Sequence, residues 1–113
     1  AASETAGEIA AAGGKARAYE VDVSNPTSAQ AAVAAVAADL GRPSVLVNSA
    51  GIGKFARAHE TSFEDWSRII AVNLTGSFLM AKEVLPHLLQ GGGNIVNIAS
   101  NAGLLGQPFS VAY

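Results

Sequence analysis

The sequence contains no cysteine, and charged side chains make up only 14% of its 113 residues. Without cysteine the chain cannot form a disulfide framework, a thiolate zinc site or a cysteine nucleophile, and the composition fits a reducing compartment. The formal net charge is -2, and the seven lysines and arginines are scattered singly. Because no basic patch is available for a phosphate backbone or an anionic membrane, we expect neither nucleic acid nor membrane as a partner.

Long hydrophobic runs are also missing from the sequence. No stretch reaches the ~18 consecutive apolar residues of a membrane span, and residues 1–4 lack the charged and apolar regions of a signal peptide. We therefore expect a cytoplasmic protein. Hydrophobic residues still account for 50% of the chain, which together with the low net charge excludes a disordered protein. Because a domain typically has ~100–200 residues, the chain is long enough for at most one domain, residues 1–113.

Three segments carry helical signals. The sequence predicts a helix over residues 4–12 that ends at Gly13-Gly14. A second begins at Asn25-Pro26 and ends at Gly41. A long third helix begins at a capping box of Thr61 and Glu64, and Pro86 should kink or end it.

Three shorter segments are predicted to be strands: residues 16–23, 45–47 and 94–99. The run Val45-Leu46-Val47 is continuously apolar, which is typical of a strand buried on both faces of a parallel sheet. The alternation of helices and strands predicts a doubly wound α/β fold with a parallel sheet. Ligands in such folds bind at the carboxyl ends of the strands, which here are Asp22-Val23, Asn48–Gly51 and Ala99-Ser100.

These positions resemble the classical short-chain dehydrogenase/reductase family, and the resemblance covers essentially the whole chain. Asp22-Val23 matches the family's strand-end aspartate, and Asn48-Ser49-Ala50-Gly51 matches its Asn-Asn-Ala-Gly turn with one departure at Ser49. Asn73 matches the active-site asparagine of a helix. Ser100 precedes Tyr113 by thirteen residues, the family's spacing between catalytic serine and tyrosine.

The resemblance implies an oxidoreductase that transfers a hydride between NAD or NADP and a small alcohol or carbonyl substrate. It implies that Tyr113 is the acid/base and that Ser100 holds the substrate oxygen. Asn73, through its backbone carbonyl at a helix irregularity, would hold a water linked to a lysine that the family places four residues after the tyrosine. A free phenol titrates near ~10, so Tyr113 needs such a neighbouring cation. The implied cofactor contacts are Asp22 at the adenine amino group, Val23, Asn48, Ala50, Gly51 and Tyr113.

Several residues also admit simpler interpretations. Asp22, taken alone, is an ordinary strand exit that leads to a helix cap. Gly51 and Gly53 do not make the glycine-rich dinucleotide fingerprint. His59 and His87 have no second ligand at metal spacing, so no metal site is predicted.

The family's strand order, 3-2-1-4-5, implies an incomplete sheet, because two strands absent from residues 1–113 separate the strand ending at Asp22 from the one ending at Asn48. We therefore expect a partial, Rossmann-like NAD(P)-binding domain, truncated at both ends and inactive in isolation. The family also pairs the long helix with its copy in a second subunit, so Phe78, Leu85 and Leu88 are candidate contacts of a dimer or tetramer.

Other functions stay open at this stage. One alternative is a non-catalytic nucleotide-binding relative, and another is an unrelated flavodoxin-like module. Among enzymes, a 3-oxoacyl-thioester reductase and an alcohol, sugar or steroid dehydrogenase are not separated.

Overall fold

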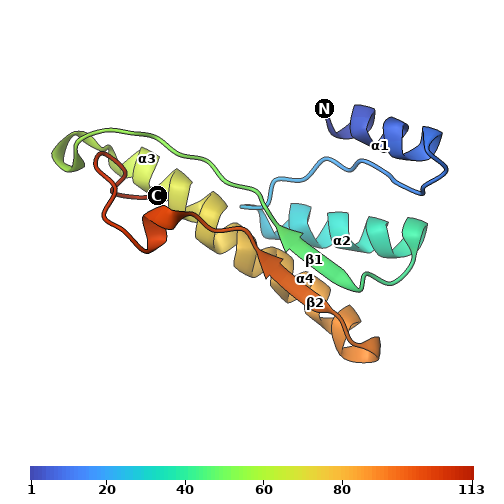
Figure 1. Ribbon diagram of the computed structural model, residues 1–113. Coiled ribbons are helices and arrows are strands. Elements are labelled where there is room, and N and C mark those ends of the chain that lie inside the picture. The colour runs from blue at the N-terminus through green and yellow to red at the C-terminus, as the bar shows by residue number, and fades with distance from the viewer.

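The computed structural model describes residues 1–113 and shows helices against a two-stranded parallel sheet (Figure 1). The helices and strands in chain order are α1 Ala2–Ala11, α2 Pro26–Leu40, β1 Val45–Asn48, α3 Phe63–Ile70, α4 Gly76–Gly91 and β2 Asn94–Asn97. A π-helical turn, Ala71–Thr75, joins α3 to α4 without a break. Short 3₁₀ turns occupy Ala58–Glu60 and Asn101–Gly103. The α/β class is therefore as predicted.

The ends of α1 and α2 follow the predicted signals. At the end of α1 the backbone N–H of Gly13 donates to Ala10 and that of Gly14 to Ile9, with Gly13 at a φ of +85°. This pattern of bonds favours glycine because a side chain at positive φ is strained. The Asn25 side chain caps α2 by accepting from the Ser28 N–H at 3.0 Å. Pro26 occupies the first turn, where its missing N–H costs no helical bond.

The core lies where α2 and α4 meet one face of the sheet. β1 and β2 pair in parallel, with Leu46 opposite Ile95 and Asn48 opposite Asn97. Four buried side chains form the core cluster: Val33, Leu46, Val84 and Leu88. Leu88, predicted as a subunit contact, is thus a core residue, whereas Phe78 and Leu85 are exposed.

The predicted strand over residues 16–23 does not form. These residues run as an extended segment between α1 and α2, and no neighbouring strand pairs with them (Figure 1). A strand needs a hydrogen-bonding partner, and the predicted strand order places two further strands between this segment and β1. The sheet is therefore incomplete, as the family resemblance implied.

The two strands that form also differ from the prediction. Along β1 buried and exposed residues alternate, because Leu46 and Asn48 face α4 while Val45 and Val47 are 54% and 55% exposed. The strand is therefore buried on one face only. β2 ends at Asn97 instead of residue 99, because Asn97 is the last residue with a partner in β1, Asn48.

The long helix begins one residue later than predicted. Ser62, not Thr61, is the N-cap, and it accepts from the Asp65 N–H at 3.1 Å. The Thr61 hydroxyl instead donates to the Arg57 carbonyl in the preceding turn. Pro86 does not end the helix, which runs to Gly91. Val84 and Leu88 anchor α4 in the core on both sides of this exposed proline.

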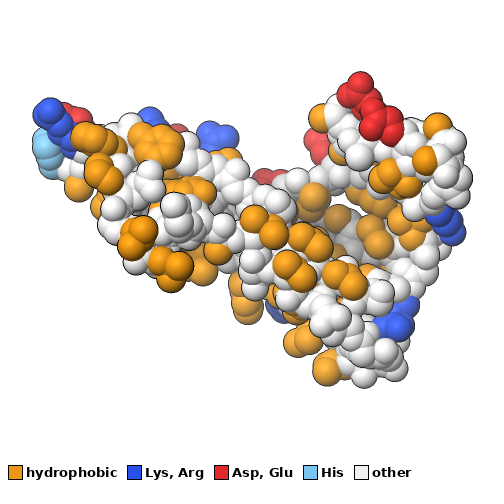
Figure 2. Space-filling view, in the orientation of Figure 1, with side chains coloured by type: hydrophobic (Ala, Val, Ile, Leu, Met, Phe, Trp, Pro, Cys, Tyr) orange, Lys and Arg blue, Asp and Glu red, His pale blue; other side chains and the backbone are white.

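The structure is open. Its radius of gyration is 16.4 Å, whereas a compact chain of this length would have about 13 Å. Only 9 of 113 residues are buried, so most apolar side chains remain on the surface. Figure 2 shows apolar side chains around the hollow between the α1 region and the rest of the molecule.

The continuous helical stretch Phe63–Gly91 has the length and apolar composition of a membrane-crossing helix. Core helices of water-soluble proteins pass the same test. Here the stretch packs Ile69, Leu79, Val84 and Leu88 inside the protein.

Candidate active site

A cleft of about 690 Å³ opens at the carboxyl ends of β1 and β2. Residues from four separate parts of the chain line it, because both parallel strands end at this edge of the sheet. The lining residues are Ser49–Gly53, Phe55, Asn73, Leu74, Ser77, Asn97–Ser100, Gly103 and Tyr113. The cleft thus brings together the three predicted catalytic residues with Ala50 and Gly51, and no charged side chain is among them.

Asn73 lies in the π-turn, which is the helix irregularity that the family resemblance implied. Its side chain forms two hydrogen bonds with the backbone of Ile52. Asn73 Oδ1 accepts from the Ile52 N–H, and Asn73 Nδ2 donates to the Ile52 carbonyl, each at 2.8 Å. These bonds hold the loop after β1 against the helix. The Asn73 backbone carbonyl accepts from the Ser77 hydroxyl at 3.1 Å.

Ser100 and Tyr113 reach the cleft from the segment that follows β2. The Ser100 hydroxyl caps the 3₁₀ turn Asn101–Gly103 by accepting from the Ala102 N–H at 3.1 Å. It also donates to Asn101 Oδ1 at 3.3 Å. The Tyr113 ring lies beside Gly53, where a Cβ added to the glycine would lie 3.5 Å from Tyr113 Cδ2. Tyr113 is 48% exposed and lines the cleft.

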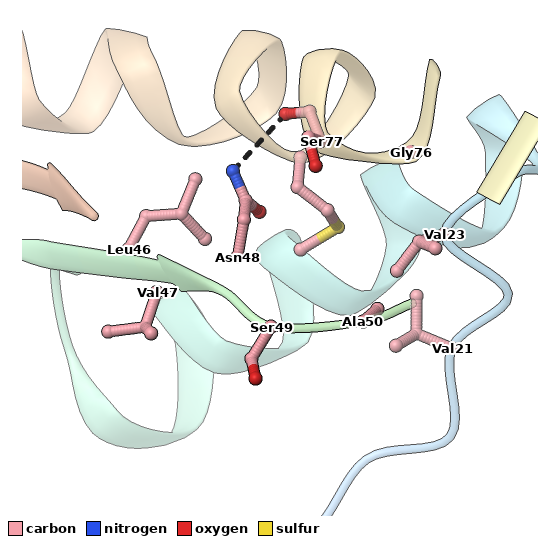
Figure 3. Close-up of a pocket in the computed structure, with 10 residues that line it drawn as sticks. Val21, Val23, Leu46, Val47, Asn48, Ser49, Ala50, Gly76 and Ser77 are labelled. Carbon is pink, nitrogen blue, oxygen red and sulfur yellow. Dashed lines mark hydrogen bonds between the residues drawn. The ribbon is translucent and has the colours of Figure 1, made fainter. Parts of the chain in front are cut away.

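A second, smaller cavity of about 240 Å³ lies next to the cleft (Figure 3). Val21 and Val23 approach it from the extended segment, while Asn48, Ser49 and Ala50 line it from the end of β1. Gly76 also lines it and approaches Val23 closely, since a Cβ at position 76 would lie 2.7 Å from Val23 Cγ2. The predicted cofactor residues Val23, Asn48 and Ala50 therefore share this cavity, and Ala50 also lines the larger cleft.

Asp22 lines neither cavity, although both of its neighbours line the smaller one. Its carboxylate accepts from the Ser24 N–H at 2.9 Å and from the Ser24 hydroxyl at 2.6 Å. These hydrogen bonds lower the pKa of Asp22. The contacts are those of the turn that leads into α2, which is the simpler of the two interpretations, and the adenine role stays a prediction.

The sequence analysis missed two polar residues of the site, Ser77 and Asn97. Buried Asn48 donates through Nδ2 to Asn97 Oδ1 at 2.9 Å and to the Ser77 carbonyl at 3.3 Å. Signals for both were present in the sequence. Ser77 follows Asn73 by four residues, which is one helical turn, and Asn97 occupies the strand-end position that matches Asn48.

An ion pair borders the loop that leads from β1 to α3. Lys54 Nζ donates to Asp65 Oδ2 at 2.7 Å, and the Ser62 hydroxyl donates to the same oxygen at 2.6 Å. These two hydrogen bonds lower the pKa of Asp65, and the bond from Lys54 has the larger effect. The structure groups no three His, Asp or Glu side chains that could hold a metal ion.

Comparison with solved structures identifies the type of α/β fold that the chain adopts. The structure superposes on NAD⁺-bound xylitol dehydrogenase with a TM-score of 0.93 and 33% sequence identity. The match covers 99% of this chain and 44% of that protein. The fold is therefore that of a Rossmann-type, doubly wound α/β protein.

The sequence matches the short chain dehydrogenase family over residues 1–113. D-threitol dehydrogenase of Mycolicibacterium smegmatis is 47% identical over 98 residues, which are 86% of this chain and 38% of that protein. The inactive 2-(S)-hydroxypropyl-CoM dehydrogenase 2 of Xanthobacter autotrophicus is 43% identical over 113 residues, 99% of this chain and 48% of that protein. The chain spans less than half the length of these relatives. It belongs to the short chain dehydrogenase family of oxidoreductases.

Proposed function

We propose that the protein containing this chain is an NAD- or NADP-dependent oxidoreductase, and that residues 1–113 supply part of its cofactor-binding domain and catalytic groups. The observation that carries the proposal is the cleft, which gathers Asn73, Ser100 and Tyr113 beside Ala50 and Gly51. We propose that the smaller cavity, which is lined mainly by apolar residues, takes the adenine ring, and that Asp22, whose neighbours Val21 and Val23 line the cavity, accepts from the exocyclic amino group. When bound, the nicotinamide accepts or supplies the hydride.

The chain's own residues handle the substrate oxygen and its proton. Oxidation of an alcohol requires removal of the hydroxyl proton, and reduction of a carbonyl requires its return. Tyr113 is proposed to exchange that proton through its phenol oxygen, while the Ser100 hydroxyl holds the substrate oxygen in place. Asn73 is proposed to present its backbone carbonyl to a water that connects the site to solvent. Positioned proton transfer of this kind contributes about 100- to 10,000-fold to a rate.

The substrate class we propose is a small polyol or diol. The support is the similarity to dehydrogenases named for threitol and xylitol, two sugar alcohols, together with a cleft lining that contains only neutral side chains. We further propose a homo-oligomer that buries the exposed face of α4 around Phe78 and Leu85. The cytoplasmic location stays a prediction.

The test is to express the complete open reading frame that encodes residues 1–113 and to assay it with NAD and with NADP. Threitol, xylitol and butane-2,3-diol are offered for oxidation, and a 3-oxoacyl thioester for reduction. We expect turnover of at least one polyol or diol with one of the two cofactors. Turnover of the thioester alone would contradict the substrate class.

A non-catalytic relative is the second candidate, because a relative described as inactive is 43% identical over nearly the whole chain. Cofactor binding measured by calorimetry distinguishes the two candidates. Binding of NAD or NADP without turnover of any substrate would favour the non-catalytic relative.

A further inference from the structure

Ser77 lies between the two cavities and forms two hydrogen bonds, one through its hydroxyl and one through its backbone carbonyl. It lies in the first turn of α4, is partly buried and lines the larger cleft and the smaller cavity. Its hydroxyl donates to the Asn73 carbonyl at 3.1 Å. Its own carbonyl accepts from Asn48 Nδ2 at 3.3 Å, the bond drawn in Figure 3.

These two bonds connect two further hydrogen-bonded pairs. On one side Asn73 holds both backbone groups of Ile52 at 2.8 Å. On the other side Asn48 holds Asn97 at 2.9 Å. Ser77 therefore completes a continuous path of hydrogen bonds from the loop after β1, through the π-turn and α4, to the end of β2. Ser100 follows Asn97 by three residues along the same segment.

The π-turn explains why a hydroxyl is useful at this position. The Gly76 N–H donates to the Ala71 carbonyl five residues before it, so the regular helical pattern of bonds to the fourth preceding residue is shifted here. A serine hydroxyl can donate to the carbonyl four residues earlier, which supplies a donor where the backbone pattern is displaced. The bond fixes the orientation of the Asn73 peptide and of the side chain that holds Ile52.

We propose that Ser77 is a positioning residue, whose hydroxyl holds the Asn73 carbonyl in the orientation that the proton path to Tyr113 requires. This inference rests on the proposed function, since it assigns a purpose to the Asn73 carbonyl in that reaction. It predicts that the hydroxyl of residue 77 matters for proton transfer, whereas the shape of its side chain matters little.

The test compares Ser77→Val with Ser77→Thr in the complete protein. The two side chains have the same shape, and only threonine keeps the hydroxyl. For Ser77→Val we expect kcat to fall about fivefold, the equivalent of one hydrogen bond of about 1 kcal/mol. We also expect the rising limb of the kcat pH profile to move to higher pH with little change in KM for the cofactor. Ser77→Thr should restore both the rate and the pH profile.

A second measurement does not depend on activity. Residue-resolved hydrogen exchange reports the Ile52 amide, whose N–H is held by Asn73. We expect faster exchange at Ile52 in Ser77→Val than in Ser77→Thr. If Ser77→Val does not fold, Ser77→Ala replaces it in both measurements.

The outcomes separate this inference from the proposed function. Equal pH profiles and equal Ile52 exchange in the valine and threonine variants would overturn the positioning role while leaving the oxidoreductase intact. If the wild-type protein turns over no substrate, the proposed function fails, and with it the catalytic purpose of Ser77. Ile52 exchange then decides only whether the hydroxyl orients Asn73.

Discussion

The polar cleft at the strand ends and a third hollow, an apolar groove along β1, differ in how their walls are built. The cleft at the carboxyl ends of the strands is built by hydrogen bonds among Asn48, Ile52, Asn73, Ser77 and Asn97. An apolar groove of about 310 Å³ lies along β1 beside the extended segment, and ten of its eleven lining residues are hydrophobic. The residues that line the polar cleft all lie between Ser49 and Tyr113. The groove leaves Val45 and Val47 54% and 55% exposed.

The difference teaches that the hydrogen-bonded cleft and the packed core have separate requirements. Directional hydrogen bonds between adjacent elements can place the site residues locally. Apolar burial instead scales with the area removed from water, so it needs further layers of structure. The following predictions test this comparison in the complete protein.

The largest expected effect contrasts the chain's two tyrosines, one in the cleft and one in the groove. Tyr113→Phe removes the proposed acid/base, so we expect kcat to fall by about 100-fold or more. Tyr19→Phe removes a hydroxyl that donates to Asp39 at 2.9 Å, away from the cleft, and should keep the wild-type kcat. Steady-state kinetics check both. Equal losses in the two variants would break the distinction between cleft and groove.

The next prediction concerns the core beneath the sheet. Leu88 is 7% exposed and its neighbour Leu89 is 79% exposed. Leu88→Ala should lower the free energy of unfolding by about 2–5 kcal/mol because it leaves a cavity in the core. Within one subunit, Leu89→Ala should change it by no more than about 0.5 kcal/mol. Denaturant unfolding measures both values. An additional, concentration-dependent loss in Leu89→Ala would support the proposed homo-oligomer, because Leu89 follows Leu85 by four residues on the exposed face of α4. Equal, concentration-independent losses in the two variants would contradict the assignment of Leu88 to the core.

A smaller effect is expected where the extended segment meets α4. Alanine at Gly76 would place its Cβ 2.7 Å from Val23 Cγ2, so Gly76→Ala should destabilise the protein by about 1–3 kcal/mol. Val23→Ala removes the 2.7 Å contact, while the Cβ and the carbonyl oxygen of residue 23 stay 3.1 Å and 3.3 Å from the added Cβ, so Gly76→Ala should cost less in this background than in the wild type. A double-mutant cycle measures this coupling. Additive changes would mean that the two elements do not touch in the complete protein.

The smallest effect is a pH dependence at Asp65. Lys54 and Ser62 lower its pKa below the ordinary value of 3.8. A carboxyl group whose folded pKa is lowered stabilises the fold above its unfolded pKa, and this contribution is lost as the pH falls through the folded pKa. The stability gap between wild type and Asp65→Asn should therefore be present at neutral pH and shrink in acid. Because both partners are at the surface, high salt should reduce the gap. A gap that is independent of pH would contradict the ion pair.

Local signals predicted most of the secondary structure correctly. The Asn25-Pro26 start of α2 and the glycine end of α1 depend on backbone geometry within a few residues, and both were confirmed. The N-cap of α3 was assigned one residue too early, because Thr61 and Ser62 both have capping side chains. Only the structure shows that the preceding turn occupies the Thr61 hydroxyl.

The predicted strand over residues 16–23 shows where local signals are insufficient. Its alternating residues have strand-like character, but a strand exists only with a hydrogen-bonded neighbour. The one-sided burial of β1 has the same origin, since its other face lacks a covering layer in this chain.

By itself the sequence determined the α/β class, the family and the candidate catalytic residues, because motifs and spacing are properties of the chain. Tertiary structure alone decided that Ser77 and Asn97 join the site and that Leu88 lies in the core. It also decided that the Asn73 side chain, which lies in a π-turn, accepts a hydrogen bond from the Ile52 N–H. These facts depend on which distant residues meet across elements, and hydrogen bonds and burial act through space and not along the sequence.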